Sequence, residues 1–565
     1  MLKKIQQDFS YYSHEFKDNY RKGVHRLRTI LASRAQAQAF VSNAGGVAVV
    51  LGYEPETPDK NAQELYALLA ASPYIDDAVQ TFLGSIYEAG AESQDAMYAD
   101  SARCLEILHD PVMSRAAGAG AVSAGKWIAT LAGQSCAAYT GIAAVAASET
   151  AMTAVAASET AMAAVVGNAT ALHAVVTSQV ALNAVAASET AMAAVIGNAT
   201  ALNVVATSQA AMNAVAASET AMTAVIANTA AFNTVVTSHV AMNAVASSYV
   251  AVAAVYESAV AVEAVKANET AWATLTGASS AVMGKAAAKL AGLNPADYAD
   301  MTAVASSSTA MAAIIGNSTA LNAVVSSSTA MTAVASSQTA MTAVASSYVA
   351  VAAVYGSAVA VDAVKANETA WATLTGATSA VMGKAVAVLS GLNPDSYADM
   401  TAVASSSTAM TAVASSQTAM AAVAASQTAM AAIIANSTAL NAVVSSSAAM
   451  SAVAASQTAM AAIAASSIAL SAIAASTTAL DAIYAKKKRM SGASASLSGK
   501  FIILQISNDN AFDTSQYGYA TLSDGSKPKW DSYKGKYAYF KQYKKIATYM
   551  KNDTDRDDWI DYFQC

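Results

Sequence analysis

The sequence has few of the residues on which most enzymes and disulfide-stabilised proteins depend. It contains three cysteines and five histidines in 565 residues. Cys104, Cys136 and Cys565 are too few and too widely spaced for a disulfide framework or a zinc knuckle, so we expect buried or idle thiols. No histidine follows position 239, and no phosphate-binding glycine loop or nucleophile elbow is present. We therefore expect no enzymatic activity, no cofactor and no metal site.

Charge is also scarce, at 12% of residues and a net charge of -7. Between residues 141 and 480 there are five lysines, no arginine and 13 acidic residues. Nucleic-acid binding depends on neutralising phosphates, so we expect no nucleic-acid partner. Residues 486–489, KKKR, are the one basic run near this region. We interpret the run as a solvated boundary, with a polyanion-binding patch as the alternative.

Long hydrophobic runs are missing as well. The first residues, MLKKIQQDFSYYSHEF, lack the apolar core of a secretion signal, and no stretch of about 18 uninterrupted apolar residues occurs. We expect neither a signal peptide nor a transmembrane segment. The mean hydropathy of +0.36 is then explained by internal packing.

A ten-residue repeat, A-[M/L]-x-A-V-x-x-[S/N]-x-[T/V], fills the middle of the chain, as in AMTAVAASET and ALHAVVTSQV. Its eighth position is Ser or Asn 13 times from Ser148 to Asn268, seven times from Ser307 to Asn367 and eight times from Ser406 to Ser476. A Ser or Asn followed by Ala, Met and Leu is typical of a helix N-cap. Each decapeptide is thus predicted to be one short helix and one tight corner.

The apolar positions of the repeat fall on one helical face, whereas in a strand Met/Leu and Val would point to opposite faces. Two-turn helices are not stable alone, so they must stack on their neighbours. A 30-residue superperiod runs from about Ser148 to Ser238. We predict a mainly α, elongated solenoid with three decapeptides per turn. The Val, Thr, Asn and Gly content leaves a three-sided β-solenoid as the alternative.

A larger unit interrupts the repeats twice, near residues 249–300 and 348–399, at an offset of 99 residues. The segment KANETAWATLTGASSAVMGKAAAKLAGLNPADYADM around Trp272 returns almost unchanged around Trp371. Such similarity indicates duplication and an adjustable repeat number. The two tryptophans are interpreted as packing residues, with a ligand platform as the alternative.

The two ends differ from the middle in composition. Residues 1–140 hold four of the seven prolines and show helical spacing, which predicts a helical head that attaches to a larger assembly. Residues 141–485 are the predicted shaft. Residues 486–565 carry a strand signal, SGKFIILQISN, and a net charge of +5, which predicts a small β-rich tip.

Aromatic residues concentrate in this predicted tip. Aromatic and basic side chains together suit contact with sugars or an anionic surface. The acidic stretch NDTDRDDWID lacks the Gly and the distal Glu of a helix-loop-helix calcium loop, so we interpret it as a surface run. The candidate receptor-binding residues are Trp530, Tyr533, Tyr537, Tyr539, Phe540 and Tyr543.

The repeats AMTAVAASETAMAAVVGN and ALNAVVSSSTAMTAVASSQ resemble the Ala/Ser/Met-rich decapeptide arrays of tailed-bacteriophage fibre proteins. The segment LSGKFIILQISN is similar to short β modules that end some of those fibres. The resemblance implies a structural virion fibre, in which the head binds other virion proteins and the tip meets a host-surface glycan or protein. It also implies a possible homo-oligomer. The alternatives are a bacterial surface adhesin or another extended repeat-based binding protein, and a tip with glycan hydrolase activity.

Overall fold

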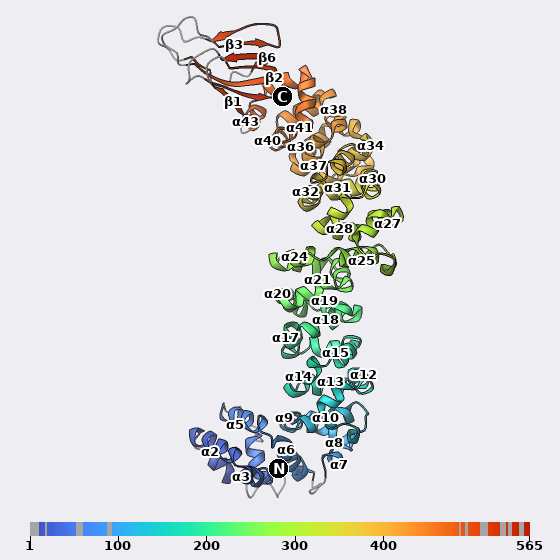
Figure 1. Cartoon of the computed structure of the whole chain (residues 1–565), viewed down its shortest axis with the longest axis vertical. Helices are drawn as coiled ribbons and strands as arrows, with labels where there is room; N and C mark the ends of the chain where they lie inside the picture. Colours follow the sequence, from blue (N-terminus) through green and yellow to red (C-terminus); the bar gives the residue numbers. More distant parts are fainter. Residues whose placement is uncertain are drawn as a thin grey trace. The chain divides into compact units, whose positions relative to one another are not determined.

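The computed structural model describes residues 11–16, 20–51, 60–87, 93–484, 487–491, 495–508, 518–530, 538–540, 545–552 and 559–564. The chain divides into two compact units, Met1–Ala278 and Ser279–Cys565. Helices make up most of both units, and an antiparallel sheet lies near the C-terminus (Figure 1). The prediction of a mainly helical chain with a small β-rich C-terminal region is thereby confirmed.

Unit 1 begins with a group of short helices separated by capped breaks. Asp100 caps α8 and Asp110 caps α9, whose first residue is Pro111, a residue that fits the first turn because it needs no N–H partner there. Fully buried Leu27, Phe82 and Trp127 fill the core of this group. The helices are α2 (Tyr20–Ala32), α3 (Arg34–Val41), α4 (Ala44–Val50), α5 (Lys60–Ala70), α6 (Ile75–Ile86), α7 (Gln94–Tyr98), α8 (Ser101–His109), α9 (Pro111–Ala119) and α10 (Ala121–Leu131).

The decapeptides of unit 1 follow as helices of six to nine residues. Between residues 142 and 484, all of which the structure describes, no residue lies in a strand, so the β alternative is wrong for this region. The helices are α11 (Ile142–Ala147), α12 (Glu149–Ala157), α13 (Glu159–Val166), α14 (Ala169–Thr177), α15 (Gln179–Ala186), α16 (Glu189–Ile196), α17 (Ala199–Thr207), α18 (Gln209–Ala217), α19 (Glu219–Ala227), α20 (Thr229–Thr237), α21 (His239–Ser247), α22 (Tyr249–Glu257), α23 (Ala259–Lys266) and α24 (Glu269–Thr276).

Each break between these helices is a corner set by the Ser or Asn of the repeat. Ser158 has extended backbone angles, and its hydroxyl accepts the N–H of Ala161, three residues on. Consecutive helices then change direction sharply, by 100° between α13 and α14 and 97° between α15 and α16. One residue type at one position therefore ends a helix, turns the chain and starts the next helix.

The apolar positions of the repeat form the packed seam of the array. Ala151, Met152 and Val155 are fully buried, whereas Thr153 and Ala157 on the same helix are exposed. Helix α12 packs on α15, α15 on α18 and α18 on α21, so helices three apart lie against each other (Figure 1). Burial of one Met side chain is worth about 1.5–3 kcal/mol, which a two-turn helix obtains only from these neighbours.

Unit 2 repeats this organisation with two longer helices, α25 and α34. Its helices are α25 (Ser280–Leu290), α26 (Met301–Ser306), α27 (Ser308–Gly316), α28 (Ser318–Ser326), α29 (Ser328–Ala335), α30 (Gln338–Ala345), α31 (Tyr348–Gly356), α32 (Ala358–Lys365), α33 (Glu368–Thr375), α34 (Ser379–Leu389), α35 (Met400–Ser405), α36 (Ser407–Ser415), α37 (Gln417–Ala425), α38 (Gln427–Ala435), α39 (Ser437–Val444), α40 (Ser447–Ala455), α41 (Gln457–Ala465), α42 (Ser467–Ala475) and α43 (Thr477–Tyr484).

The tryptophans of the duplicated unit contact neighbouring side chains. Trp371 meets the ring of Tyr355 edge-on at 6.2 Å between centroids, and the Lys365 ammonium lies 5.2 Å from the centre of the Trp371 ring. Lys266 stands over Trp272 in the same way, at 5.6 Å. These contacts agree with a packing role for both tryptophans.

The sheet of unit 2 is antiparallel, with strand order β1-β7-β2-β6-β3-β4, and β5 pairs with β2. Its core includes Phe501, Ile503, Met550 and Ile560. The register shifts within β2 between Ile503 and Gln505, where β2 pairs with β7. The strands are β1 (Lys488–Ser491), β2 (Ala495–Asn508), β3 (Gly518–Leu522), β4 (Lys529–Trp530), β5 (Ala538–Phe540), β6 (Lys545–Asn552) and β7 (Trp559–Gln564).

Candidate functional site

The predicted aromatic surface of the tip lies only partly within the described residues. Trp530 ends β4 and is paired with Gly518 of β3, whereas Phe540 ends β5 and is paired with Ile506 of β2, one residue after Tyr539. The candidates outside the described residues are Tyr533, Tyr537 and Tyr543. A receptor-binding role for this set therefore stays a prediction.

The basic run after α43 has a structural partner that the sequence did not reveal. Asp561 of β7 is fully buried, and the Arg489 guanidinium binds both of its oxygens, at 2.6 and 2.9 Å. The Lys487 ammonium lies 2.9 Å from the second oxygen. Lys488 is exposed and Arg489 is 47% exposed, as a solvated boundary predicts, but Lys487 and Arg489 also form ion pairs with a buried carboxylate. Lys486 lies outside the described residues.

The electrostatics of Asp561 follow from these two partners. Burial alone would raise the pKa of the carboxyl group, but the hydrogen bonds from Arg489 and Lys487 outweigh burial and hold the pKa below its usual value. Lys487 also donates to the Tyr484 hydroxyl at 2.7 Å, and that hydroxyl donates to Gln505 at 2.6 Å. The last array helix is thus bound to two strands of the sheet.

A second set of specialised contacts lies at three related segments, which we name the joint segments: residues 121–147, 280–306 and 379–405. Each contains an 11-residue helix, a 3-10 turn and a six-residue helix. The 3-10 turns are η1 (Cys136–Ala138), η2 (Pro295–Asp297) and η3 (Pro394–Ser396). The first joint segment was not recognised from sequence, yet it matches the second at 11 of 27 positions, including Gly-Lys at 125–126 and Leu-Ala-Gly at 131–133.

Two glycines of each joint segment are required by the backbone. Gly133, Gly292 and Gly391 end the long helices with φ of +72°, +74° and +71°, a left-handed conformation that favours glycine. A Cβ atom on Gly284 would lie 2.3 Å from the carbonyl carbon of Asp300, and one on Gly383 would lie 2.2 Å from that of Asp399. The long and short helices of each joint segment therefore cross in direct backbone contact.

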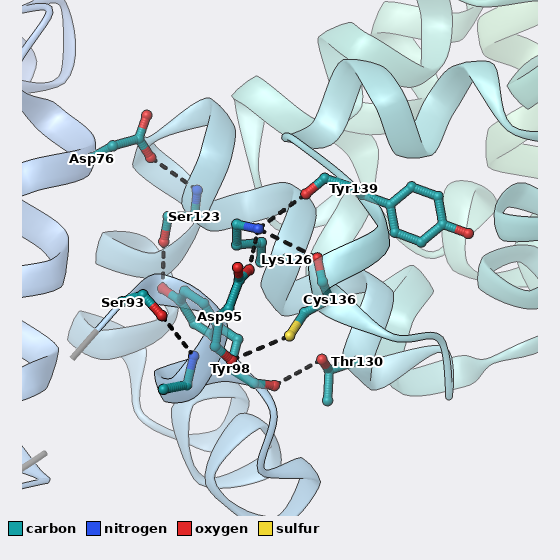
Figure 2. Close-up of polar contacts among 10 residues, drawn as sticks. Asp76, Ser93, Asp95, Tyr98, Ser123, Lys126, Thr130, Cys136 and Tyr139 are labelled. Atoms are coloured by element: carbon teal, nitrogen blue, oxygen red, sulfur yellow. Dashed lines mark hydrogen bonds and ion pairs between the residues drawn. The ribbon is translucent and has the colours of Figure 1, made fainter.

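At the first joint segment, helices that precede it in the chain supply polar groups that the segment itself lacks (Figure 2). Ser279 and Thr378 cap α25 and α34 with their own hydroxyls, whereas the corresponding residue before α10 is Gly120. Asp76 of α6 replaces the missing cap, since its carboxylate accepts the N–H of Ser123 at 2.9 Å. Gly120 leaves the space for this carboxylate, because a Cβ there would lie 2.0 Å from it.

Lys126 is the charged centre of the same junction. Its ammonium forms an ion pair with Asp95 of α7 and donates to the backbone carbonyls of Cys136 at 3.4 Å and Tyr139 at 3.1 Å (Figure 2). The Lys126 side chain is 11% exposed and the Asp95 side chain 46%, so the ammonium is largely removed from water while the carboxylate stays partly solvated. Lys126 therefore binds α7 to the 3-10 turn of the first joint segment.

Neutral hydrogen bonds surround this ion pair. The buried Tyr98 hydroxyl is hydrogen-bonded to Ser123, and the Tyr98 carbonyl accepts the Thr130 hydroxyl at 2.8 Å (Figure 2). The Trp127 indole donates to the Cys104 carbonyl at 3.0 Å. Burial raises the pKa of the Cys104 thiol to about 12, so the group is a protonated packing thiol and a poor nucleophile near neutral pH. The cluster is chemically suited to holding two parts of the chain together.

The array corners carry a third arrangement, repeated along the chain. The Ser188 hydroxyl accepts the N–H of Ala191 at 3.2 Å and also donates to the carbonyl of Ala156, 32 residues earlier, at 2.5 Å. Asn198 does the same with its amide, accepting from Ala201 at 3.0 Å and donating to Val166 at 3.1 Å. The other corners with a bond across 32 residues are Ser178, Ser218, Ser238, Ser248, Asn268, Ser337, Ser357, Ser446, Ser456 and Ser476.

These corners satisfy backbone groups at two helix ends with one side chain. A helix leaves N–H groups free at its start and carbonyls free at its end. Ser and Asn can both donate and accept, whereas an ionised Asp only accepts. Asp300 caps α26 and Asp399 caps α35. At these two helices the structure shows only the cap bond, in which the carboxylate accepts an N–H of the helix that follows. The need to donate as well as accept explains the preference for Ser and Asn over Asp at the twelve corners that make the bond across 32 residues.

The two thiols described, Cys104 and Cys136, are buried and free. Within the described ranges, no group of three or more His, Cys, Asp or Glu side chains is placed to hold a metal ion. No single helix of the described part is long and apolar enough to cross a membrane. No protein-family model matches the chain, and no curated protein matches it significantly.

Proposed function

We propose that this chain is a structural virion fibre: a solenoid spacer that joins an attachment head to a tip for host-surface binding. The proposal includes no enzymatic activity. The head, within residues 1–140, binds other virion proteins, and the β-rich tip presents the candidate surface around Trp530, Tyr539 and Phe540 to a glycan or protein. Homo-oligomer formation is compatible with this arrangement.

The observation that carries the proposal is that each array helix contacts only helices close to it in the sequence. Outside the joint segments, an array helix packs chiefly on helices one, three and four positions away, as α18 does on α19, α21 and α22. In such an arrangement each added repeat extends the stack and leaves the rest unchanged. A spacer needs this property, whereas an active site needs distant segments brought together.

The hydrogen bonds across 32 residues support a stiff spacer. Each bond joins a corner to the corner one turn earlier, so successive turns are held at their corners as well as by the apolar seam. The bonded groups are neutral, and neutral groups need no counter-charge to be buried. Similarity in repeat style to tailed-bacteriophage fibres adds the virion as the setting, and the spacer argument does not depend on it.

Electron microscopy of the purified chain tests the spacer. Helices pack about 8–10 Å apart, so 28 decapeptides in three-helix turns should give a rod on the order of 90 Å long with a density at each end. A compact particle without a thin section would contradict the proposal.

Binding of the purified chain to cells tests the tip separately. The substitutions Trp530→Ala and Tyr539→Ala should reduce adsorption without shortening the rod. A substitution in the array, Thr153→Ala at an exposed position, is the control and should change neither. Adsorption that survives the tip substitutions would assign host contact to another region.

A further inference from the structure

The three joint segments have the same internal geometry and similar connections to the helices that follow. The backbone crossing at Gly125, Gly284 and Gly383 is the same, with the missing Cβ 2.1–2.3 Å from a backbone carbon in each. After each long helix, a corner 27 residues on donates to the last carbonyl of that helix: Ser158 to Leu131 at 3.2 Å, Asn317 to Leu290 at 2.8 Å and Ser416 to Leu389 at 3.0 Å.

We propose that the joint segments are exchange points at which the array can be shortened or lengthened by whole blocks without changing the two ends of the chain. The inference concerns how the array is built, and it holds whether or not the chain is a virion fibre.

The helices before the third joint segment have near-identical counterparts in the sequence before the second. Helix α34 packs on α31, and Lys384 of α34 lies 5.5 Å from the ring centre of Tyr348. Residues 249–279 differ from residues 348–378 at only three positions. A chain from which residues 280–378 are removed would therefore offer α34 the same partner surface, with α22 in the place of α31.

The first joint segment is specialised for the helices of the head. Ser123, Trp127 and Thr130 make its hydrogen bonds to Tyr98 and Cys104. The matching residues of the second joint segment are Val282, Ala286 and Lys289. Val282 and Ala286 have no polar side-chain atom, and Lys289 has a long charged side chain in the place of the Thr130 hydroxyl. The head should thus accept the first joint segment and reject the second.

The test compares two deletion variants of the full chain. Removal of residues 280–378 should leave the mean residue ellipticity at 222 nm unchanged, keep hydrogen-exchange protection in residues 379–405, and shorten the rod by about three turns, on the order of 30 Å. Removal of residues 121–279 also joins equivalent positions, but the head helices α6 to α8 should lose protection. Adding Val282→Ser, Ala286→Trp and Lys289→Thr to that second variant should restore it.

Each outcome decides part of the proposal. Loss of helicity or of protection at residues 379–405 in the first variant would overturn exchange between blocks. Full head protection in the second variant without the three substitutions would overturn the specialisation of the first joint segment, and so would failure of the substitutions to restore it.

Discussion

The array corners and the chain-end junctions connect helices by different chemistry. At a corner such as Ser188, one small neutral side chain serves a helix start and a helix end at once. At the junctions, charged groups from distant segments meet: Asp95 with Lys126 near the head, and Asp561 with Arg489 near the sheet. Both arrangements satisfy buried polar backbone or side-chain groups, but only the neutral one recurs.

The difference in chemistry follows from how often each kind of connection occurs in the chain. A corner such as Ser188 accepts from the helix that it starts and donates to a helix end one turn earlier, so its side chain must be able to do both. A junction occurs once and faces an unlike element, so two complementary charges can be used there. Only Lys126 and Asp561 are the buried members of these pairs, and a buried charge is costly to leave without its partner.

The largest expected loss of stability comes from adding a methyl group at a joint segment, where we expect less tolerance than at an array corner. Gly383→Ala places a methyl group 2.2 Å from a backbone carbon, so we expect a loss of about 3 kcal/mol in local stability. Gly356→Ala at the end of α31 is the matched control, because its Cβ would meet nothing within 4 Å. Hydrogen exchange of α34 and α35 measures the difference, and equal exchange in the two variants would refute the tight crossing.

The next effect concerns the charged junction at the sheet. Arg489→Met removes two charge-assisted bonds from buried Asp561, and we expect a loss of about 2–3 kcal/mol. Lys488→Met, one residue away, removes an exposed bond to Gln564 and should change stability by less than about 0.5 kcal/mol. Exchange protection of β1 and β7 is the readout, and similar losses for the two variants would mean that the Asp561 pair contributes little.

A smaller loss of stability should distinguish corners that make two hydrogen bonds from corners that only cap a helix. Ser188→Asp keeps the cap but turns a carboxylate toward the Ala156 carbonyl, so we expect a loss of about 1–2 kcal/mol. Ser258→Asp should cost less than about 0.5 kcal/mol, because the structure shows this hydroxyl only as a cap for Ala261. Urea denaturation followed by circular dichroism compares them. Equal midpoints would remove the explanation given for the absence of Asp at repeat corners.

The smallest effect appears only in acid. Since the folded-state pKa of Asp561 is lowered, its contribution to stability is present above the ordinary carboxyl pKa of 3.8 and is lost as pH falls through the lower folded value. Protection of β7 should therefore decline below about pH 4, whereas Asp561→Asn should flatten this decline. A decline that is the same in both chains would assign acid sensitivity to other groups.

Local patterns in the sequence predicted much of this fold. The Ser and Asn positions marked helix starts because a cap acts on the residues that directly follow it, as Ser158 does on Ala161. The change to strands was visible in SGKFIILQISN, which became part of β2. Both signals lie within about ten residues of chain.

The specialised contacts were missed because they join residues far apart in sequence. Nothing near Asp76 indicates that it caps α10, which begins 45 residues later. The sequence does hold one sign of a missing cap: position 120 is Gly, whereas the later joint segments have Ser or Thr at the matching position. Asp561 and Arg489 are separated by 72 residues. At twelve corners a second bond spans 32 residues, as from Ser188 to Ala156, and its only trace in the sequence is the absence of Asp at these positions.

The buried methionines of the array have a chemical consequence. Met152, Met162 and Met222 are fully buried, and no other array methionine is more than 7% exposed. Oxidation to the sulfoxide would place a polar oxygen in the seam, so peroxide can reach these sulfur atoms only when neighbouring turns separate. The pattern of methionine oxidation along the chain would then record where, and how often, the array opens.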